Sequence, residues 1–225
     1  MTKAIKPKNK QEEKSEKTRD LTLRTTVDCI YDYGYAKTST KKIADRAKIS
    51  RGAMVHHFPS KQSLLNAVVN HIIDVRIDAY ARDMNQNLTN AEERREGGLD
   101  IYWKHLHTKY FTAHHELLVA SRTDPELKTV MRHGIRRFED RWREMILTTF
   151  PEWKDTGPLF DLAMDVTQFS FEGMALNKLS RDAKRRQKNL VAYVQSRVHE
   201  IFEAGLRGDN DRSVAEFIIR HNTPG

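Results

Sequence analysis

The spacing of the apolar residues constrains the fold of this chain more than any other feature of its sequence. Leu23, Val27, Ile30 and Gly34 follow one another at intervals of four, three and four residues, which places them on one face of an α-helix. A similar spacing begins again at Leu64, and no segment alternates apolar and polar residues over the length of a strand. Because the 225 residues include only 10 Gly and 6 Pro, the sequence predicts an all-α fold.

Proline, glycine and capping residues divide this pattern into separate helices. A short hydroxyl at Ser39 or Thr40 can cap one helix, Ser50 can cap the next, and Pro59 ends it. A break at Gly97-Gly98 is an alternative within one of the longer helices. The predicted helices cover residues 18–33, 40–48, 51–58, 61–84, 91–114, 115–121, 125–149, 158–180, 182–206 and 213–221.

The formal net charge of +8 is concentrated near the N-terminal end. Residues 1–62 hold 15 Lys/Arg and 7 Asp/Glu, whereas residues 63–225 hold 24 of each. A basic module joined to a neutral one predicts a polyanionic partner for the first module alone. The alternative is a solubilising tail, because four lysines within residues 1–10 supply part of the excess.

The single cysteine and the lack of long apolar runs argue against disulfides, secretion and a membrane-spanning segment. Cys29 is the only cysteine, so the chain forms no internal disulfide and no zinc site built on cysteines. It lies on the apolar face of the first predicted helix, where a small core residue is expected. The N-terminus lacks the apolar core of a secretory signal, and no run of about 18 apolar residues spans a membrane. We therefore expect a soluble cytoplasmic protein without a membrane partner.

Two short predicted helices joined by a tight turn follow a longer first helix, which is the pattern of a helix-turn-helix. In that motif the second short helix enters the major groove of DNA with its N-terminal residues against the base edges. Arg51 opens this helix, and its planar guanidinium can bond O6 and N7 of guanine together, while Gly52 permits a close approach. Ser50 and the free amides beside it suit a phosphate, and His56 and His57 can reach phosphate from the end of the helix. The alternative is an ordinary helical hairpin with solvated charges.

The same region resembles the signature of TetR-family repressors, in segments that occur together, in order and at that family's spacing within residues 18–70. Outside this span the resemblance is only architectural. It implies an all-helical homodimer whose head reads a palindromic operator on double-stranded DNA, and whose larger domain binds a small organic inducer and forms the dimer contact. The segments are Gly34-Tyr35, Thr38-Ser39-Thr40-Lys41-Lys42-Ile43-Ala44, Ile49-Ser50-Arg51-Gly52-Ala53, His56-His57-Phe58-Pro59-Ser60-Lys61 and Leu64-Leu65.

The resemblance implies phosphate contacts at the start of the second helix, base contacts at the start of the third, and further backbone contacts after it. The sequence departs from the family at two positions. Val55 stands where the family usually has a phosphate-binding tyrosine, so either His56 or His57 replaces it or this contact is weaker. Lys48 stands where the family favours glycine, which strains the backbone if φ is positive but adds a cation beside the groove. The residues assigned to DNA binding are Thr38, Ser39, Thr40, Lys41, Lys48, Ser50, Arg51, Gly52, His56, His57 and Lys61.

We therefore expect a flexible basic arm over residues 1–17, a helix-turn-helix head over residues 18–62 and a helical ligand-sensing and dimerisation domain over residues 63–225. In the last of these, Trp103, His107, Tyr110, His114 and Leu117 recur at helical spacing. This mixture of rings and hydrogen-bonding groups suits a cleft for an organic ligand with a ring or a carbonyl, and the alternative is an ordinary core. The residues assigned to the ligand are Trp103, His107, Tyr110, His114 and Phe169.

The two long helices predicted over residues 158–180 and 182–206 each carry an apolar stripe, and Gly173 would let a partner helix approach closely. Two such helices from each chain form an intersubunit four-helix bundle, as the resemblance also implies. The alternative is packing within one chain. The residues assigned to the dimer contact are Leu162, Val166, Gly173, Leu176, Leu190, Val194, Val198 and Ile201.

Neither a metal site, a cofactor nor an enzyme active site is expected. His105 and His107 point to different faces of a helix, and His107 and His114 are separated by two turns, roughly 10 Å. The sequence has no Gly-rich phosphate loop and no nucleophile elbow. The remaining alternatives to a ligand-responsive regulator are a small helical enzyme and an architectural DNA-binding protein. The long, neutral C-terminal part argues against the architectural alternative.

Overall fold

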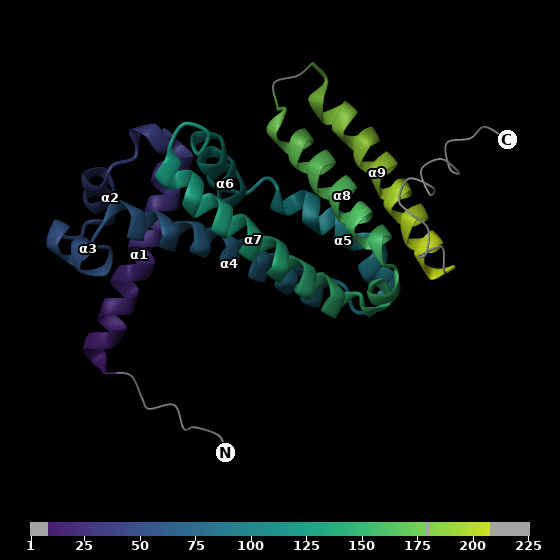
Figure 1. The fold of residues 1–225 in the computed structure, drawn as a ribbon, viewed down its shortest axis with the longest axis horizontal. Coiled ribbons are helices and arrows are strands. Elements are labelled where there is room, and N and C mark those ends of the chain that lie inside the picture. Colours follow the sequence, from purple (N-terminus) through teal and green to yellow (C-terminus); the bar gives the residue numbers. More distant parts are fainter. Residues whose placement is uncertain (1–8, 179–180, 208–225) are drawn as a thin grey trace. The chain divides into compact units, whose positions relative to one another are not determined.

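The computed structural model describes residues 9–178 and 181–207, and every regular element in these ranges is helical (Figure 1). This confirms the predicted all-α fold class. None of the described helices is both long and apolar enough to cross a membrane. The elements are α1 (Lys10–Tyr33), η1 (Tyr35–Lys37), α2 (Thr40–Ala47), α3 (Arg51–His57), α4 (Lys61–Asn87), α5 (Ala91–His105), α6 (Lys109–Ala120), α7 (Pro125–Thr149), η2 (Pro151–Asp155), α8 (Pro158–Leu176) and α9 (Ala183–Leu206).

The described residues form two compact units, each built from two stretches of chain. Unit 1 contains the residues up to Asp78 together with Thr108–Glu139, and unit 2 contains Ala79–His107 together with the residues from Asp140 onward. Unit 1 therefore holds α1, η1, α2, α3 and α6, with parts of α4 and α7. Unit 2 holds the remaining parts of α4 and α7, with α5, η2, α8 and α9.

Helix α1 begins at Lys10, eight residues before the predicted start at residue 18. The side chain of Asn9 accepts a hydrogen bond from the Gln11 amide at 3.3 Å, and the Asn9 amide donates to Glu12 at 3.0 Å. This capping box satisfies amide groups that the first turn leaves free. Residues 10–17, which we expected in a flexible arm, are therefore helical. The remaining residues of that predicted arm, 1–8, lie outside the described residues.

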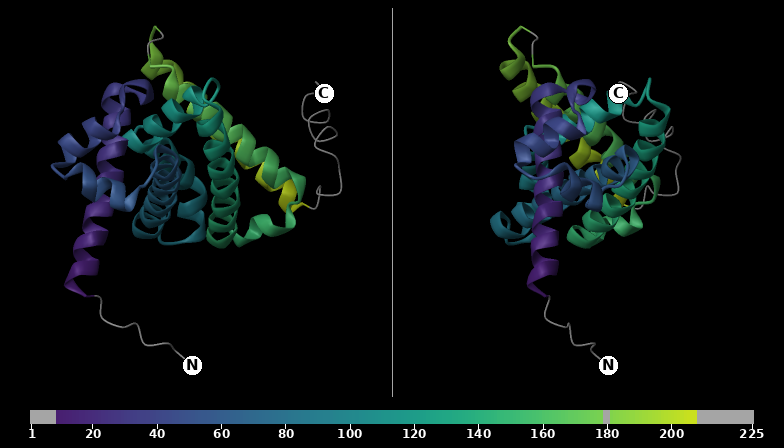
Figure 2. Two further views of the ribbon diagram at one scale, coloured as in Figure 1. Left: turned by 60° about the vertical axis from the view of Figure 1, so that its left-hand side comes forward. Right: turned by 90° about the vertical axis from the view of Figure 1, so that its left-hand side faces the viewer.

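The buried face of α1 forms the centre of unit 1. Leu23, Val27, Cys29 and Ile30 are each at most 2% exposed, which confirms the predicted apolar face and the core position of the cysteine. Helices α2, α3 and α6 and the turn η1 all pack against α1 (Figure 2). The helix ends where predicted, at Gly34, whose φ of 77° favours glycine.

A polar cluster ties η1 to three other elements of unit 1. The Tyr35 hydroxyl donates to Asp124 at 2.7 Å, and its amide donates to Glu116 of α6 at 3.0 Å. The Lys61 ammonium of α4 lies 3.9 Å from the Asp124 carboxylate and 5.1 Å from the centre of the Tyr35 ring. The hydrogen bond to Tyr35 raises the pKa of Lys61, and the amide of Leu127 is the main cause that lowers the pKa of Asp124. Lys61 and Asp124 are therefore both charged near neutral pH, as the ion pair between them requires.

The prediction of one helix over residues 91–114 is wrong. Helix α5 ends at His105, and α6 starts at Lys109 with Thr108 as its N-cap, whose hydroxyl accepts from the Phe111 amide at 3.4 Å. Leu106 in the connection is 1% exposed, so the break is anchored in the core. Gly97-Gly98, the break that we considered, lies inside α5, and the predicted helix over 115–121 is the second half of α6.

In unit 2, α8 and α9 lie side by side and pack closely (Figures 1 and 2). Phe160 and Phe171 of α8, Trp153 of η2 and Phe202 of α9 are all buried. Helix α9 ends at Leu206 as predicted, while α8 ends at Leu176, before the predicted end at residue 180. The last predicted helix, over residues 213–221, lies outside the described residues.

Replacing Tyr35 with phenylalanine tests the polar cluster. Tyr35→Phe keeps the ring below Lys61 but removes the hydroxyl that donates to the half-buried Asp124. We expect the free energy of unfolding to fall by about 1–2 kcal/mol, because a hydrogen bond to a charged group is lost. The measurement is denaturant unfolding at neutral pH.

Tyr33→Phe is the matched control, since the Tyr33 side chain is exposed and its ring contacts with Lys42 and Arg46 do not need the hydroxyl. Its stability should stay within a few tenths of a kcal/mol of the parent. Equal stability of Tyr35→Phe and Tyr33→Phe would show that the cluster does not hold η1 in place.

Candidate nucleic-acid interface

Helices α2 and α3 form the two short helices of the predicted helix-turn-helix, and each begins at a predicted cap. The Ser39 hydroxyl accepts from the Lys42 amide at 3.2 Å, and the Ser50 hydroxyl accepts from the Ala53 amide at 3.1 Å. Both hydroxyls satisfy amides of a first helical turn. The apolar sides of the two helices turn inward through Ile43 and Met54, each 2% exposed.

Lys48 ends α2 in the left-handed conformation, with φ 54° and ψ 40°. The sequence predicts backbone strain at Lys48 if its φ is positive, and φ is positive here. The left-handed conformation costs about 1–2 kcal/mol for a residue with a Cβ. The Lys48 amide donates to the Asp45 carbonyl at 3.2 Å, and the Ile49 amide donates to the Ala44 carbonyl at 3.1 Å. The turn is therefore closed by backbone hydrogen bonds, and its exposed lysine side chain is not part of that closure.

The first residues of α3 are open to solvent. Arg51 is exposed, and a Cβ placed on Gly52 would meet only the Ser50 hydroxyl, at 4.0 Å. Within residues 9–178 and 181–207, no acceptor pairs with the side chains of Arg51, Lys41 or Lys48. These three cations are therefore available to an external anion, and the space beside Gly52 would admit a close approach.

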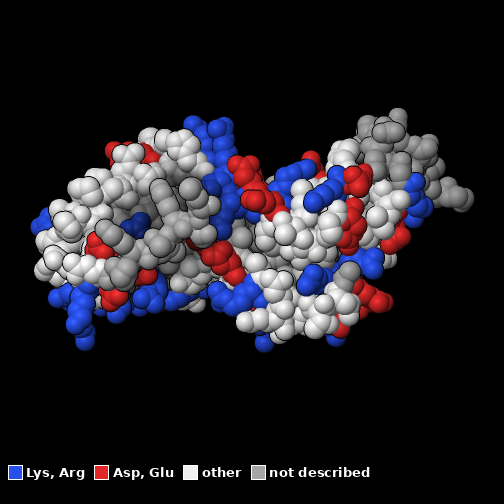
Figure 3. Space-filling view, turned by 90° about the horizontal axis from the view of Figure 1, so that it is seen from below, with Lys and Arg blue, Asp and Glu red and all other residues white. Residues whose placement is uncertain are grey.

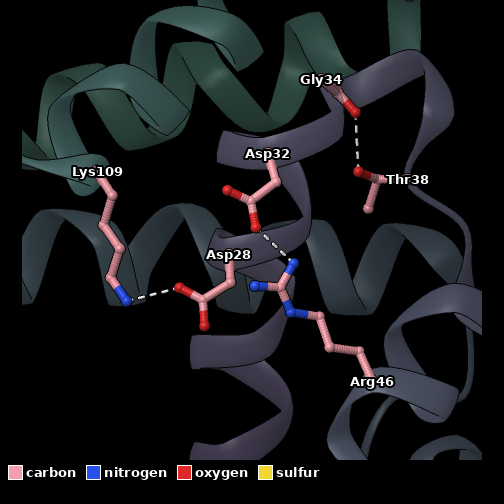
Figure 4. Close-up of polar contacts among 6 residues, drawn as sticks. All are labelled: Asp28, Asp32, Gly34, Thr38, Arg46 and Lys109. Carbon is pink, nitrogen blue, oxygen red and sulfur yellow. Dashed lines mark hydrogen bonds and ion pairs between the residues drawn. The ribbon is translucent and has the colours of Figure 1, made fainter.

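Positive charge dominates the surface around these helices. Residues 34–62 contain seven Lys/Arg and one Asp/Glu. Figure 3 shows a row of Lys and Arg side chains along the lower margin of its left-hand part, the part that carries α2 and α3 in Figure 1. Three of the cations have partners within the chain. Arg46 pairs with Asp32 of α1 at 2.6 Å (Figure 4), Lys42 donates to the Lys37 carbonyl at 2.9 Å, and Lys61 pairs with Asp124.

The two histidines at the end of α3 differ in their surroundings. His56 is exposed, whereas His57 is half-buried, and their ring centres are 5.4 Å apart. Burial, together with the positive charges of His56 and Arg19, lowers the pKa of His57. Val55, at the family's tyrosine position, is exposed beside them. The assignment of His56 and His57 to phosphate stays a prediction.

Some other residues assigned to DNA already have partners in the chain. The Thr38 hydroxyl donates to the Gly34 carbonyl at 2.8 Å (Figure 4), and Lys61 belongs to the Tyr35–Asp124 cluster. Thr40, the first residue of α2, is half-buried. The sequence did not reveal the internal role of Lys61, because its partner Asp124 lies far away along the chain. Contacts of these residues with DNA stay predictions.

The residues assigned to the ligand do not share one helix, because the chain leaves the helical conformation between α5 and α6. Trp103 and His107 lie together in unit 2 with ring centres 4.7 Å apart, beside a shallow cleft that Lys184 and Lys188 also line. In unit 1, the Tyr110 ring contacts His71. His114, also in unit 1, is buried, and burial holds its pKa well below the usual value. Phe169 is an exposed residue of α8.

The stripes assigned to the dimer contact divide into a buried set and an exposed set. Val194, Val198 and Ile201 of α9 are at most 8% exposed, so they pack within unit 2, as in the alternative that we considered. On α8, Leu162 and Val166 are half-exposed. The exposed apolar residues of this region include Phe169, Leu176, Leu190 and Tyr193. A Cβ placed on Gly173 would have no atom within 4 Å, so open space lies beside it.

Metal-binding geometry is absent from the described part of the chain, since no group of three or more His, Cys, Asp or Glu side chains there could hold an ion. The histidines at 105, 107, 114 and 115 lie on two helices and their connection.

Residues 23–68 match the family model described as bacterial regulatory proteins, tetR family. An HTH-type transcriptional regulator of Mycobacterium tuberculosis is 23% identical over 128 residues, which are 57% of this chain and 65% of that protein. The HTH-type transcriptional regulator CymR of Pseudomonas putida is 24% identical over 187 residues, 81% of this chain and 90% of that protein. The chain thus spans just under two thirds of the mycobacterial relative and most of CymR.

The fold is also that of known regulators. The crystal structure of a transcriptional regulator from Saccharomonospora viridis in complex with choline has a TM-score of 0.56 and 16% identity, and covers 84% of this chain and 96% of its own. The matched residues 23–68 run from α1 to α4 and include both short helices and their caps. The helix-turn-helix head of this chain, residues 23–68, is therefore that of the tetR family of bacterial regulatory proteins, and the described fold is similar to that of a solved regulator.

Proposed function

We propose that this protein is a homodimeric transcriptional regulator that binds a palindromic operator, without enzymatic activity of its own. The observation that carries the proposal is the exposed start of α3, where Arg51 has no acceptor within the described residues and adjoins the open space at Gly52. Arg51 would read a guanine in the major groove, while Lys41 and Lys48 would neutralise phosphates. The family match over residues 23–68 supports this assignment.

The proposal includes release of the operator by a small organic molecule. The regulator of Saccharomonospora viridis with a similar fold was solved with choline, which supports ligand binding in such a fold but not the same ligand here. A ligand in the helical domain would favour a spacing of the two heads that does not match successive major grooves. The coupling free energy of such a shift is typically about 1–3 kcal/mol.

Arg51→Ala tests the base contact. The substitution should cost about 1–3 kcal/mol of binding to the preferred operator and relax the preference at one base position, because a bidentate contact is lost. The measurement is fluorescence anisotropy with the operator and with duplexes that differ from it at each position in turn. An equal loss on every duplex would refute the assignment of Arg51 to a base.

Lys41→Gln is the matched comparison, because Lys41 is an equally exposed cation at the start of α2. It should weaken binding to all duplexes alike and reduce the salt dependence of log K by about one unit. A base-specific effect of Lys41→Gln would contradict the division of roles between the two helices.

The exposed stripe of α8 supports the dimer part of the proposal. Phe169 and Leu176 flank Gly173 on the face where a partner helix would approach, and Leu190 and Tyr193 of α9 are also exposed. A group of exposed apolar side chains such as this one is typical of a surface that a protein partner covers. Since open space adjoins Gly173, a larger residue fits the single chain but would hold a partner helix away.

Gly173→Leu should therefore weaken the dimer by about tenfold or more without lowering thermal stability of the single chain. Glu144→Leu, at an exposed position of α7, is the control and should leave dimerisation unchanged. Sedimentation equilibrium over a range of concentrations measures both. Unaltered dimerisation of Gly173→Leu would place the contact elsewhere.

A further inference from the structure

Unit 2 contains a second and more enclosed cleft, which no sequence pattern predicted. It has a volume of about 490 Å³ and is formed by the end of α4, α5, the end of α7, η2, α8 and α9. Neither Trp103 nor His107 lines it, although it adjoins the shallow cleft through Gln195, which lines both. The volume falls within the range of roughly 300–1,000 Å³ that is typical of small-molecule sites.

The buried part of the cleft is lined by apolar and aromatic side chains. Besides the buried Gly98, six lining residues have side chains that are at most 8% exposed: Tyr80, Ile146, Phe150, Trp153, Val198 and Phe202. Contacts between neighbouring elements fix this wall, since the Trp153 ring of η2 lies 4.8 Å from the Phe202 ring of α9. Rings held in this way offer flat surfaces against which a planar ligand can pack.

The charged lining residues are less buried than this wall, and the Arg95 guanidinium reaches over it to 5.8 Å from the centre of the Phe202 ring. Glu92, Arg95, Glu96 and His199 are exposed, and half-buried Arg94 directs its Nε to the Leu88 carbonyl at 3.3 Å. No charged side chain is therefore among the buried lining residues, and the two acidic groups at the edge are matched by two arginines. A ligand that carried a charge into the cleft would lose its hydration without gaining a counter-ion.

The uncharged polar groups of the lining are few. The Tyr80 hydroxyl donates to the Gly98 carbonyl at 3.3 Å, and burial raises the pKa of Tyr80 so that it stays protonated. Its oxygen keeps a lone pair that can accept one hydrogen bond. The Gln195 amide nitrogen donates to Asp100 at 2.7 Å, which leaves its carbonyl oxygen as a second acceptor.

We propose that this cleft is the ligand site of the protein and that it binds an uncharged molecule with fused or linked aromatic rings and few polar groups. The inference rests on the proposed ligand response and identifies the chemical class and place of the ligand. The buried aromatic wall supplies the packing surface, the lack of a buried charge selects against ions, and the cavity has room for several rings.

Binding of Nile red, an uncharged fused-ring dye whose emission rises in apolar surroundings, tests this proposal on the full chain without DNA. Met164 of α8 and Leu99 of α5 line the cleft and are half-exposed, so a larger side chain at either position fills the cleft from a different wall. Met164→Trp and Leu99→Trp should each weaken dye binding by about tenfold or more. Circular dichroism and thermal unfolding verify that each variant is folded.

Two control variants remove rings from other surfaces. Trp103→Ala alters the shallow cleft, and Phe169→Ser alters the exposed face of α8. Both should bind the dye within about twofold of the parent. Loss of binding in either control, with Met164→Trp and Leu99→Trp unaffected, would overturn the proposal, as would failure of the parent protein to bind the dye at micromolar concentration.

The same samples separate this inference from the proposed function. Operator binding by anisotropy, without dye, should be intact in Met164→Trp and Leu99→Trp, because both substitutions lie in unit 2. Operator binding without any dye binding would refute the ligand class and leave the regulator proposal standing. Dye binding to the enclosed cleft without operator binding would support the ligand site and refute the regulator proposal.

Discussion

The buried face of α1 is the constraint on which the DNA-binding head depends. Val27, Cys29 and Ile30 are almost fully removed from water, and the short helices α2 and α3 both pack against α1. Helices of eight and seven residues are too short to be stable alone in water. The orientation of α3, and with it the position of Arg51, is therefore set by packing on α1.

Ion pairs between α1 and its neighbours also fix how α2 and α6 lie against α1. Asp28 pairs with Lys109 of α6 and Asp32 pairs with Arg46 of α2, each at 2.6 Å (Figure 4). Exposed pairs of this kind contribute little stability individually, so their role is chiefly to define which faces meet. Since α6 contacts α1 and η1 within the same unit, a shift of α6 would act directly on the elements that carry α3.

Sequence patterns predicted the features that depend on local chemistry. The caps Ser39 and Ser50, the turn at Lys48 and the buried face of α1 all follow from residue type and spacing. Features that depend on distant residues were not predictable in this way. The role of Lys61 requires Asp124, and the burial of Val194 on α9 requires α8 and η2. The break at Thr108 was missed because the apolar spacing continues through it, although a threonine cap was the available signal.

Selection of bound sequences from a pool of random duplex DNA tests the central claim most directly. The account predicts enrichment of an inverted repeat, with two like half-sites whose centres are separated by a whole number of helical turns, roughly 10–10.5 base pairs each. The repeat would reflect two copies of α3 presented by one dimer. Recovery of no preferred sequence, even at low ionic strength where phosphate contacts are strongest, would contradict it.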